Sequence, residues 1–212
     1  MIAIVDYGAG NVESVRRAIA HVGATATLTD DPAQLQRADL LVFPGQGHFG
    51  QAMARLRERG LQDVLRAHID AGRPFVGICL GLQLLFERSE EAPGVAGLGV
   101  LAGEVRRFVD RDAEGARVKI PQIGWNAVQR ARAGTPLDAV PDGTSFYFVH
   151  SYHVVPDDDA VVAGRATHGG PFVAAVQRDN VFAAQFHPEK SGEAGLRLWS
   201  AILEGGWWGR AC

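Results

Sequence analysis

Cys79 stands in a sequence context that is typical of an enzymatic nucleophile. Glycines lie two positions away on either side, in the order Gly-Ile-Cys-Leu-Gly from position 77 to position 81. The apolar residues 75–78 before it have the length and β-branched content of a buried strand, and residues 80–87 after it favour helix. A nucleophile on such a strand-to-helix turn is called a nucleophile elbow. The pattern predicts sulfur where related hydrolases usually carry a serine hydroxyl.

The predicted turn also indicates how the sulfur would be activated. The first N–H groups of a helix carry partial positive charge, which favours thiolate over thiol. A Cβ at Gly77 or Gly81 would crowd the turn or an approaching substrate. The N–H of Leu80 is placed to hold a developing oxyanion. A free cysteine is more commonly an inert core thiol, so the elbow alone leaves both interpretations open.

His187 and Glu189 could supply a base and an orienting acid for this sulfur. They follow an apolar stretch, 181–185, that predicts a strand, and Pro188 between them favours extended backbone at His187. Residues two apart in extended chain point to the same side, so Glu189 can accept a proton from one ring nitrogen while the other faces the sulfur. A lone histidine near a strand end is more often structural. Combined with the elbow, however, the pair favours a catalytic triad of Cys79, His187 and Glu189.

A second glycine-rich strand end, Pro44-Gly45-Gln46-Gly47, follows the predicted strand 40–43. Its glycines allow backbone N–H groups to face an anion without interference from a Cβ. An oxyanion hole needs a second donor besides Leu80, and we expect it from Gly45 or Gln46. A plain strand-to-helix turn fits these residues equally well. Gln83 is polar among leucines one turn after Cys79, which predicts either a substrate-facing amide or an exposed glutamine.

The elements that must position these residues alternate between strand and helix in the first half of the chain. Strands are expected at 2–5, 24–28, 40–43 and 75–78, and helices at 12–21, 31–36, 51–59, 61–71 and 80–87. Asn11 is expected to cap the first helix. This alternation predicts a doubly wound, mainly parallel sheet with flanking helices, whose ligands bind beyond the carboxyl ends of its strands. Cys79 and Gly45 both occupy such ends.

The second half of the chain is rich in strands. They are expected at 104–109, 117–120, 127–129, 145–149, 152–155, 161–166, 172–178 and 181–185, with an interruption at 121–126 and a closing helix at 193–203. We interpret this half as an antiparallel extension of the same α/β fold. No repeat, low-complexity tract or linker divides the chain, so we expect one domain spanning 1–212.

Net charge, cysteine content and the length of apolar segments argue against several classes of function. A net charge of −3 offers no electrostatic basis for binding nucleic acid or acidic lipid. The only cysteines are Cys79 and Cys212, so neither a disulfide framework nor a Cys-x-x-Cys metal site is expected. The N-terminus lacks the basic region of a signal peptide, and the longest apolar stretch, 74–86, is shorter than the roughly 20 residues of a membrane span. We expect a soluble, cytoplasmic protein.

The segments 77–83 and 186–189 together resemble the class I, triad-type glutamine amidotransferases. Within that family, further motifs resemble the branch formed by the glutaminase subunits of imidazole glycerol phosphate synthases. These motifs lie at 6–11, 44–47, 121–126, 148–152 and 187–192, and the likeness spans most of the chain. Gln46 departs from the small or aliphatic residue that many relatives carry there, which leaves open whether Gly45 or Gln46 completes the oxyanion hole.

The resemblance implies a reaction and a partner. Cys79 would attack the side-chain amide of glutamine, His187 would protonate the departing ammonia, and a glutamyl thioester would be hydrolysed. Ammonia would pass through a channel to a (β/α)₈-barrel cyclase subunit, which makes imidazole glycerol phosphate and an aminoimidazole carboxamide ribonucleotide in histidine biosynthesis. No metal, cofactor, nucleic acid or membrane is expected to take part. Glutamine would be bound by Gly45, Gly47, Gln83, His150, Ser151 and Tyr152, and the partner would be met by Asn11, Pro121, Gln122, Trp125 and Lys190.

Three other readings of the sequence are less consistent with these motifs. The glutaminase of pyridoxal phosphate synthase would carry a Gly-Gly-Glu-Ser signature after an early strand, which does not occur here. A cysteine peptidase built on the same elbow would not need the segment 121–126. A non-enzymatic binding module conflicts with an intact triad.

Overall fold

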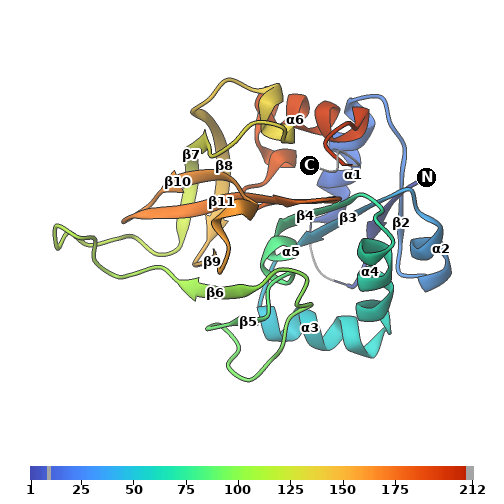
Figure 1. The fold of residues 1–212 in the computed structure, drawn as a ribbon, viewed down its shortest axis with the longest axis horizontal. Helices are drawn as coiled ribbons and strands as arrows, with labels where there is room; N and C mark the ends of the chain where they lie inside the picture. The colour runs from blue at the N-terminus through green and yellow to red at the C-terminus, as the bar shows by residue number, and fades with distance from the viewer. Residues whose placement is uncertain (9–10, 209–212) are drawn as a thin grey trace.

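The first half of the chain forms the parallel part of a twisted sheet (Figure 1). The computed structural model describes residues 1–8 and 11–208. The strands of this part are β2 (Ala26–Thr29), β1 (Ile2–Val5), β3 (Leu40–Gly45) and β4 (Phe75–Cys79), in that spatial order and all parallel. The helices that connect them are α1 (Val12–His21), α2 (Pro32–Arg37), α3 (Phe49–Glu58) and α4 (Leu61–Asp70).

The strand β12 (Val181–Ala184) joins the two halves of the sheet. It pairs in parallel with β4 and antiparallel with β11 (Pro171–Arg178). Beyond β11 the order continues antiparallel through β10, β7 and β8, while β9 pairs with β11 and β6, and β5 with β6. Their bounds are β5 (Arg88–Ser89), β6 (Gly103–Arg107), β7 (Gln122–Arg130), β8 (Thr144–His150), β9 (Tyr152–Pro156) and β10 (Val162–Thr167). The expected doubly wound sheet with an antiparallel extension is therefore confirmed.

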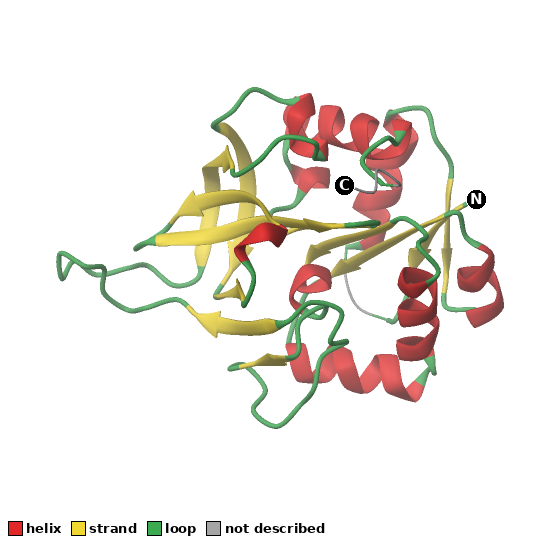
Figure 2. Cartoon of the chain, in the orientation of Figure 1, coloured by secondary structure: helices red, strands yellow, loops and turns green. Residues whose placement is uncertain are grey.

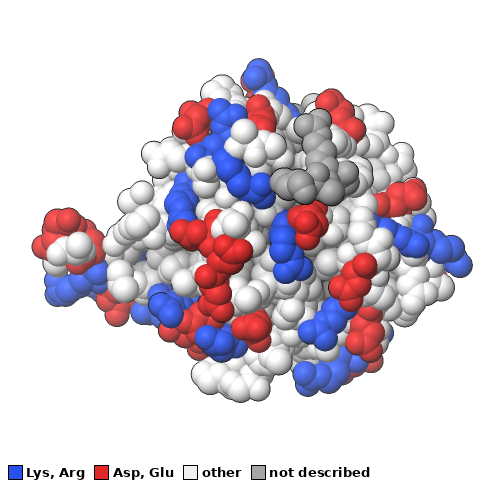
Figure 3. All heavy atoms as spheres, in the orientation of Figure 1, with Lys and Arg blue, Asp and Glu red and all other residues white. Residues whose placement is uncertain are grey.

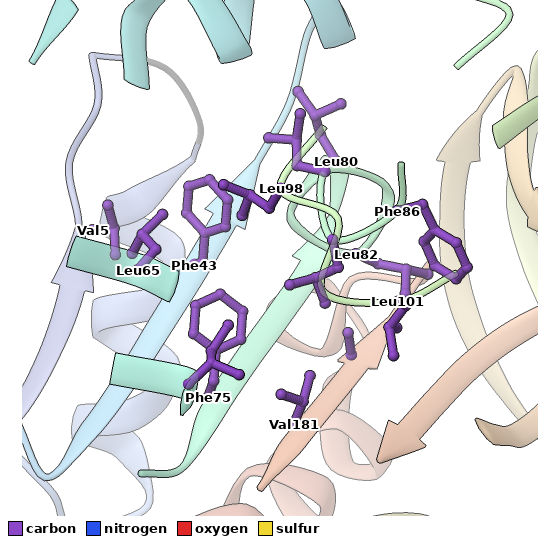
Figure 4. Packing of buried hydrophobic residues seen from close by; sticks show 14 of the residues in the cluster. Val5, Phe43, Leu65, Phe75, Leu80, Leu82, Phe86, Leu98, Leu101 and Val181 are labelled. Carbon is purple, nitrogen blue, oxygen red and sulfur yellow. The ribbon is translucent and has the colours of Figure 1, made fainter. Parts of the chain in front are cut away.

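Both faces of the parallel part are covered, which explains its nearly continuous apolar strands. Alternate residues of one strand enter opposite cores: Phe43 belongs to the cluster under α3 and α4, and Val42 to the cluster under α1 and α6 (Gly192–Glu204). Figure 1 shows these helix pairs on opposite sides of the sheet, and Figure 4 shows Phe43 and Phe75 packed within the first cluster. In contrast, Figure 2 shows that strands and loops predominate in the antiparallel half. Short 3₁₀ turns complete the chain at η1 (Pro136–Ala139), η2 (Asp159–Val161) and η3 (Pro188–Lys190).

The helix after Cys79 is shorter than expected. We predicted helix over 80–87, but α5 spans only Leu80–Gln83. The backbone then tightens, since Leu85 and Phe86 donate to carbonyls three residues back. The next carbonyls accept instead from the loop 97–101: Leu84 from Leu98, and Leu85 from both Val100 and Leu101. Tertiary hydrogen bonding therefore replaces the helical ladder despite the favourable propensity of these leucines.

Two assignments in the second half were also wrong. No strand forms at 117–120, because this segment bonds within a projecting loop instead of joining the sheet: the N–H of Val118 donates to Asp110 O, and Arg111 and Arg117 form an isolated bridge. Conversely, 121–126 does not interrupt the sheet: β7 begins at Gln122 and pairs with β8 from Gln122 to Val128. Gly124 takes a φ of 134°, which glycine tolerates, and so it bends the strand without ending it.

Smaller differences lie at the helix ends and at the edges of the described ranges. Asn11 occupies the N-cap position of α1, but its side chain makes no capping hydrogen bond. Ala9 and Gly10 of the 6–11 motif, and Cys212, lie outside the described residues. Within those residues no helix combines the length and apolar character needed to cross a membrane. Acidic and basic side chains are interspersed over the face seen in Figure 3, including the projecting loop.

Candidate active site

Cys79 ends β4 and begins α5 in a strained conformation. Its φ is 55° and its ψ is −109°, a region that residues with a Cβ rarely occupy. Such a conformation costs on the order of 1–3 kcal/mol and persists only where the surrounding packing enforces it. The turn thus raises the sulfur above the carboxyl end of the sheet, as the elbow pattern predicted.

The packing that enforces the turn depends on glycines. A Cβ on Gly81 would lie 2.0 Å from the carbonyl oxygen of Phe43, and one on Gly77 would lie 2.9 Å from the carbonyl oxygen of Gly81. Gly45 is the register neighbour of Cys79 in β3, and a Cβ there would lie 2.8 Å from the nitrogen of Gly81. The expectation that a Cβ would crowd the elbow is confirmed. These three glycines let β3, β4 and α5 approach one another closely.

His187 and Glu189 lie just past the end of β12, next to the elbow. His187 Nδ1 is 2.7 Å from Glu189 Oε1, and the two side chains are only 5% and 2% exposed. The His187 backbone is extended, as Pro188 predicted. Its backbone N–H donates to Tyr147 O and its carbonyl accepts from Ser191 Oγ, so the backbone that carries the ring is anchored on both sides of the peptide unit.

The protonation of His187 reflects opposing influences. Burial by itself would lower the pKa of its imidazole, but the nearby Cys79 sulfur and the Glu189 carboxylate together outweigh burial and raise this pKa to about 10. Nε2 is buried and has no hydrogen-bond partner among the described residues, whereas Nδ1 faces Glu189. The ring can therefore carry its charge at neutral pH and present one proton toward the sulfur side.

A cavity of about 390 Å³ opens over Cys79 and His187. Predicted site residues in its wall are Gln46, Gly47, Leu80, Gln83, His150, Ser151, Tyr152, Pro121 and Lys190. Gly45 does not line it, because it lies in the sheet beside Cys79. Across residues 1–8 and 11–208, no three histidine, cysteine, aspartate or glutamate side chains are grouped to hold a metal ion.

The structure adds residues that sequence reasoning missed. Glu91 and Val149 also line the cavity. Glu91 Oε2 accepts from the N–H of Phe49, 42 residues away, and no local pattern indicates such a contact. Gln185 is fully buried, with its Nε2 3.6 Å from Cys79 Sγ. A signal for Gln185 did exist, since it precedes His187 by two positions in extended chain.

Of the residues expected at a partner interface, Pro121 and Lys190 line the cavity, and Trp125 shares a neighbour, Tyr147, with Lys190. Trp125 is 59% exposed and meets the Tyr147 ring edge-on, with centroids 6.2 Å apart. Lys190 Nζ lies 6.0 Å from the centroid of that same ring. Gln122 differs from the expectation because it is buried, while Asn11 precedes α1, a helix that packs against η3.

Comparison with known families agrees with this geometry. Residues 3–199 match the family model described as "Glutamine amidotransferase class-I". A protein of Syntrophotalea carbinolica named imidazole glycerol phosphate synthase subunit HisH is 49% identical, covering 93% of this chain and 97% of its own length. A protein of the same name from Methanothermobacter thermautotrophicus is 48% identical, covering 96% and 98%.

Solved structures share the fold at lower identity. One described as a glutamine amidotransferase superposes with a TM-score of 0.71 at 23% identity, covering 96% of this chain and 97% of its own. The PurLQS structure from Thermotoga maritima has the same TM-score at 22% identity, with the same coverage.

Proposed function

The chain belongs to the class I glutamine amidotransferases, and on that premise we propose that it is the glutaminase subunit of an imidazole glycerol phosphate synthase. It hydrolyses glutamine to glutamate and ammonia for histidine biosynthesis, a role that places it in the cytoplasm. The observation that carries the proposal is a buried Cys79–His187–Glu189 set whose Cys79 and His187 line one cavity, in a chain whose relatives of that name are 46–49% identical. Residues 1–212 act as one domain, since β12 pairs with strands of both halves.

The first half-reaction forms a thioester. The Cys79 thiolate attacks the amide carbon of the glutamine side chain, so an S–C bond forms and the carbonyl electrons move onto oxygen. As the tetrahedral intermediate collapses, the C–N bond breaks and His187 delivers its Nε2 proton to the departing nitrogen. Ammonia leaves, and His187 remains as neutral imidazole oriented by Glu189.

The second half-reaction regenerates the enzyme. His187 now accepts a proton from water, and the resulting hydroxide attacks the thioester carbon. The C–S bond breaks, glutamate departs, and the sulfur returns to thiolate beside a charged imidazole. The raised pKa of His187 suits a ring that is protonated when each cycle begins.

Backbone donors would stabilise the oxyanion in both half-reactions. The N–H of Leu80, at the start of α5, supplies one donor, and the segment Gly45–Gln46 supplies the second. Gln46 and Leu80 both line the cavity, which supports the N–H of Gln46 as the closer candidate.

The remaining wall residues suit a free amino acid. Backbone N–H groups at Gly47, Ser151 and Tyr152 can receive the α-carboxylate, and His150 belongs to the same segment. The Glu91 carboxylate and the Gln83 amide oxygen provide acceptors for the α-ammonium group. The substrate would be held at both charged ends, with its side-chain amide toward Cys79.

The rim around the cavity would receive the (β/α)₈-barrel cyclase subunit. Trp125 and Ile123 are each 59% exposed on β7, and large exposed apolar side chains that lie together mark interaction sites. Pro121 and Lys190 continue this surface to the cavity wall, with Asn11 as its further predicted member. Ammonia released at Cys79 would then pass directly into the partner.

A paired assay tests the proposal. With the cyclase subunit present, the native chain should support the cyclase reaction with glutamine as nitrogen source. Cys79→Ser should lose at least about 10³-fold of this glutamine-dependent rate, while the rate with added ammonium salt stays unchanged. Turnover of glutamine by Cys79→Ser would exclude Cys79 as the nucleophile. A native chain that hydrolyses glutamine rapidly without any response to the cyclase would contradict the subunit assignment.

A further inference from the structure

Gln185 is a buried amide that the triad chemistry does not use. Its backbone N–H donates to Ala174 O and prolongs the ladder of β12 and β11, and its side chain is fully buried. Its side-chain nitrogen lies 3.6 Å from Cys79 Sγ, within hydrogen-bond distance for sulfur. The nucleophile therefore has a close neutral neighbour in addition to His187.

The contacts of Gln83 determine which end of this amide faces the sulfur. Gln83 Nε2 lies 3.0 Å from Tyr152 O, and a carbonyl only accepts, so this end of Gln83 must be its NH₂ group. The same NH₂ lies 3.0 Å from the Gln185 amide and requires an acceptor there, which makes that end of Gln185 its oxygen. The nitrogen of Gln185 then points at Cys79.

The Tyr152 carbonyl, at the far end of this chain of contacts, has a second hydrogen-bond partner. Tyr152 O also lies 2.7 Å from His150 Nδ1, which must carry the hydrogen. Burial lowers the pKa of His150 to about 3, so its ring stays neutral at physiological pH. The hydrogen bonds thus continue from the 150–152 segment, through Gln83, to Gln185 and the sulfur.

We propose that Gln185 is a hydrogen-bond donor to the nucleophile, and that Gln83 and Tyr152 O hold its amide so that its NH₂ group faces Cys79 Sγ. The inference rests on the proposed function only in taking this sulfur as the nucleophile. A donor to sulfur favours thiolate over thiol. Unlike His187, the amide gives up no proton, so it holds the sulfur before attack and again when the thioester breaks.

Alkylation of Cys79 by iodoacetamide, followed against pH, tests the inference. The S–C bond forms as iodide leaves, and only thiolate reacts, so the rate reports the thiolate fraction. A Cys212→Ser background leaves Cys79 as the sole thiol. Gln185→Met keeps the volume but removes the donor. The midpoint of the rate profile should move to higher pH by about one unit, so that the rate at pH values below the native midpoint falls about tenfold.

Gln177→Met is the matched control. Gln177 is a buried glutamine like Gln185, but it lies in β11, at the end of the sheet remote from Cys79. Its Nε2 donates to Trp207 O. It should lose stability to a similar extent without any change in the alkylation midpoint. A shift of equal size in this control would show that general loosening moves the profile, and would overturn the inference.

Gln185→Glu tests the orientation with nearly the same shape. An oxygen must now face the sulfur, so the midpoint should rise further than in Gln185→Met. In the native chain, the side-chain NH₂ resonances of Gln185 should shift with the alkylation midpoint, which provides a test that needs no variant to fold. The inference would be refuted by an unchanged alkylation midpoint in a folded Gln185 variant, or by Gln185 NH₂ resonances that do not change with pH. Because alkylation needs no glutamine, this result is independent of whether the chain turns glutamine over.

Discussion

The parallel and antiparallel halves of the sheet contribute to the site by different means. The parallel half supplies Cys79 through backbone packing so close that three glycines leave no room for a Cβ. The antiparallel half supplies the 149–152 wall and the rim, where Ile123 and Trp125 remain exposed. His187 and Glu189 follow β12, the strand shared by both halves.

This difference indicates that the two halves have separate roles in the site. Strained backbone such as that at Cys79 is sustained only where the surrounding elements are tightly packed, which explains why this proposed nucleophile lies in the covered, parallel half. Substrate walls and partner surfaces need side chains that reach solvent, which an antiparallel extension with one open face provides. The comparison predicts that substitutions in the two regions will differ in what they damage.

The largest effect is expected for Glu189→Gln at the junction of the two halves. The amide can still contact Nδ1, but it no longer supplies the charge that stabilises the imidazolium. Glutaminase turnover should fall by about 10³–10⁴-fold with little change in KM. Steady-state kinetics with the cyclase present would measure this. Activity close to that of the native chain would reduce the triad to a dyad.

Gly81→Ala should cause the largest loss of stability in the parallel half. The new Cβ would meet the Phe43 carbonyl at 2.0 Å, and backbone cannot move aside cheaply. The free energy of unfolding should fall by about 3 kcal/mol. Gly23→Ala is the control: its φ of 86° is unfavourable for alanine but no atom lies within 4 Å, so about 1 kcal/mol is expected. Equal losses in urea titrations would mean that the elbow is less tightly packed than we describe.

Cys79→Ala should lower the pKa of His187 from about 10, because the sulfur charge no longer offsets burial. A pKa raised by folding stabilises the native state fully below the unfolded value, roughly 6.5, and this contribution is lost as pH rises through the folded pKa. The native chain should therefore lose stability between about pH 6.5 and 10, and the variant should lose less. Imidazole NMR titration and unfolding at several pH values would measure both effects. An unchanged His187 pKa would show that the Cys79 sulfur does not influence the protonation of this ring.

The smallest effect on the isolated chain is expected for Trp125→Ala in the antiparallel half. This side chain is 59% exposed, so the free energy of unfolding should change by no more than about 0.5 kcal/mol. Affinity for the cyclase subunit should nevertheless fall by tenfold or more, as is usual for an interfacial tryptophan. Calorimetric titration against the cyclase would measure the loss. If the variant bound the cyclase as tightly as the native chain does, Trp125 would not belong to the interface.

Much of the fold was predictable because its signals are local. Alternating apolar strands and amphipathic helices indicated the parallel half, and the bounds of α1 and β1 agree with the expected ranges. The wrong predictions concern segments whose structure depends on hydrogen bonds to elements far away in the sequence. Residues 84–87 leave the helix because the loop 97–101 takes over their hydrogen bonds, and 122–126 becomes strand because β8 is there to pair with it.

Sequence by itself was enough to predict the proposed reacting groups, since the glycines around Cys79 and the spacing of His187 and Glu189 follow from the geometry of a single turn and a single extended segment. Only the tertiary structure decided what surrounds them. Gln185 could be aimed at the sulfur only after Gln83, 102 residues away, was brought beside it, and Gln83 is held in turn by Tyr152, 69 residues further along the chain. Local backbone geometry is encoded by adjacent residues, whereas the direction of a buried amide depends on which donors and acceptors the completed fold brings into contact with it.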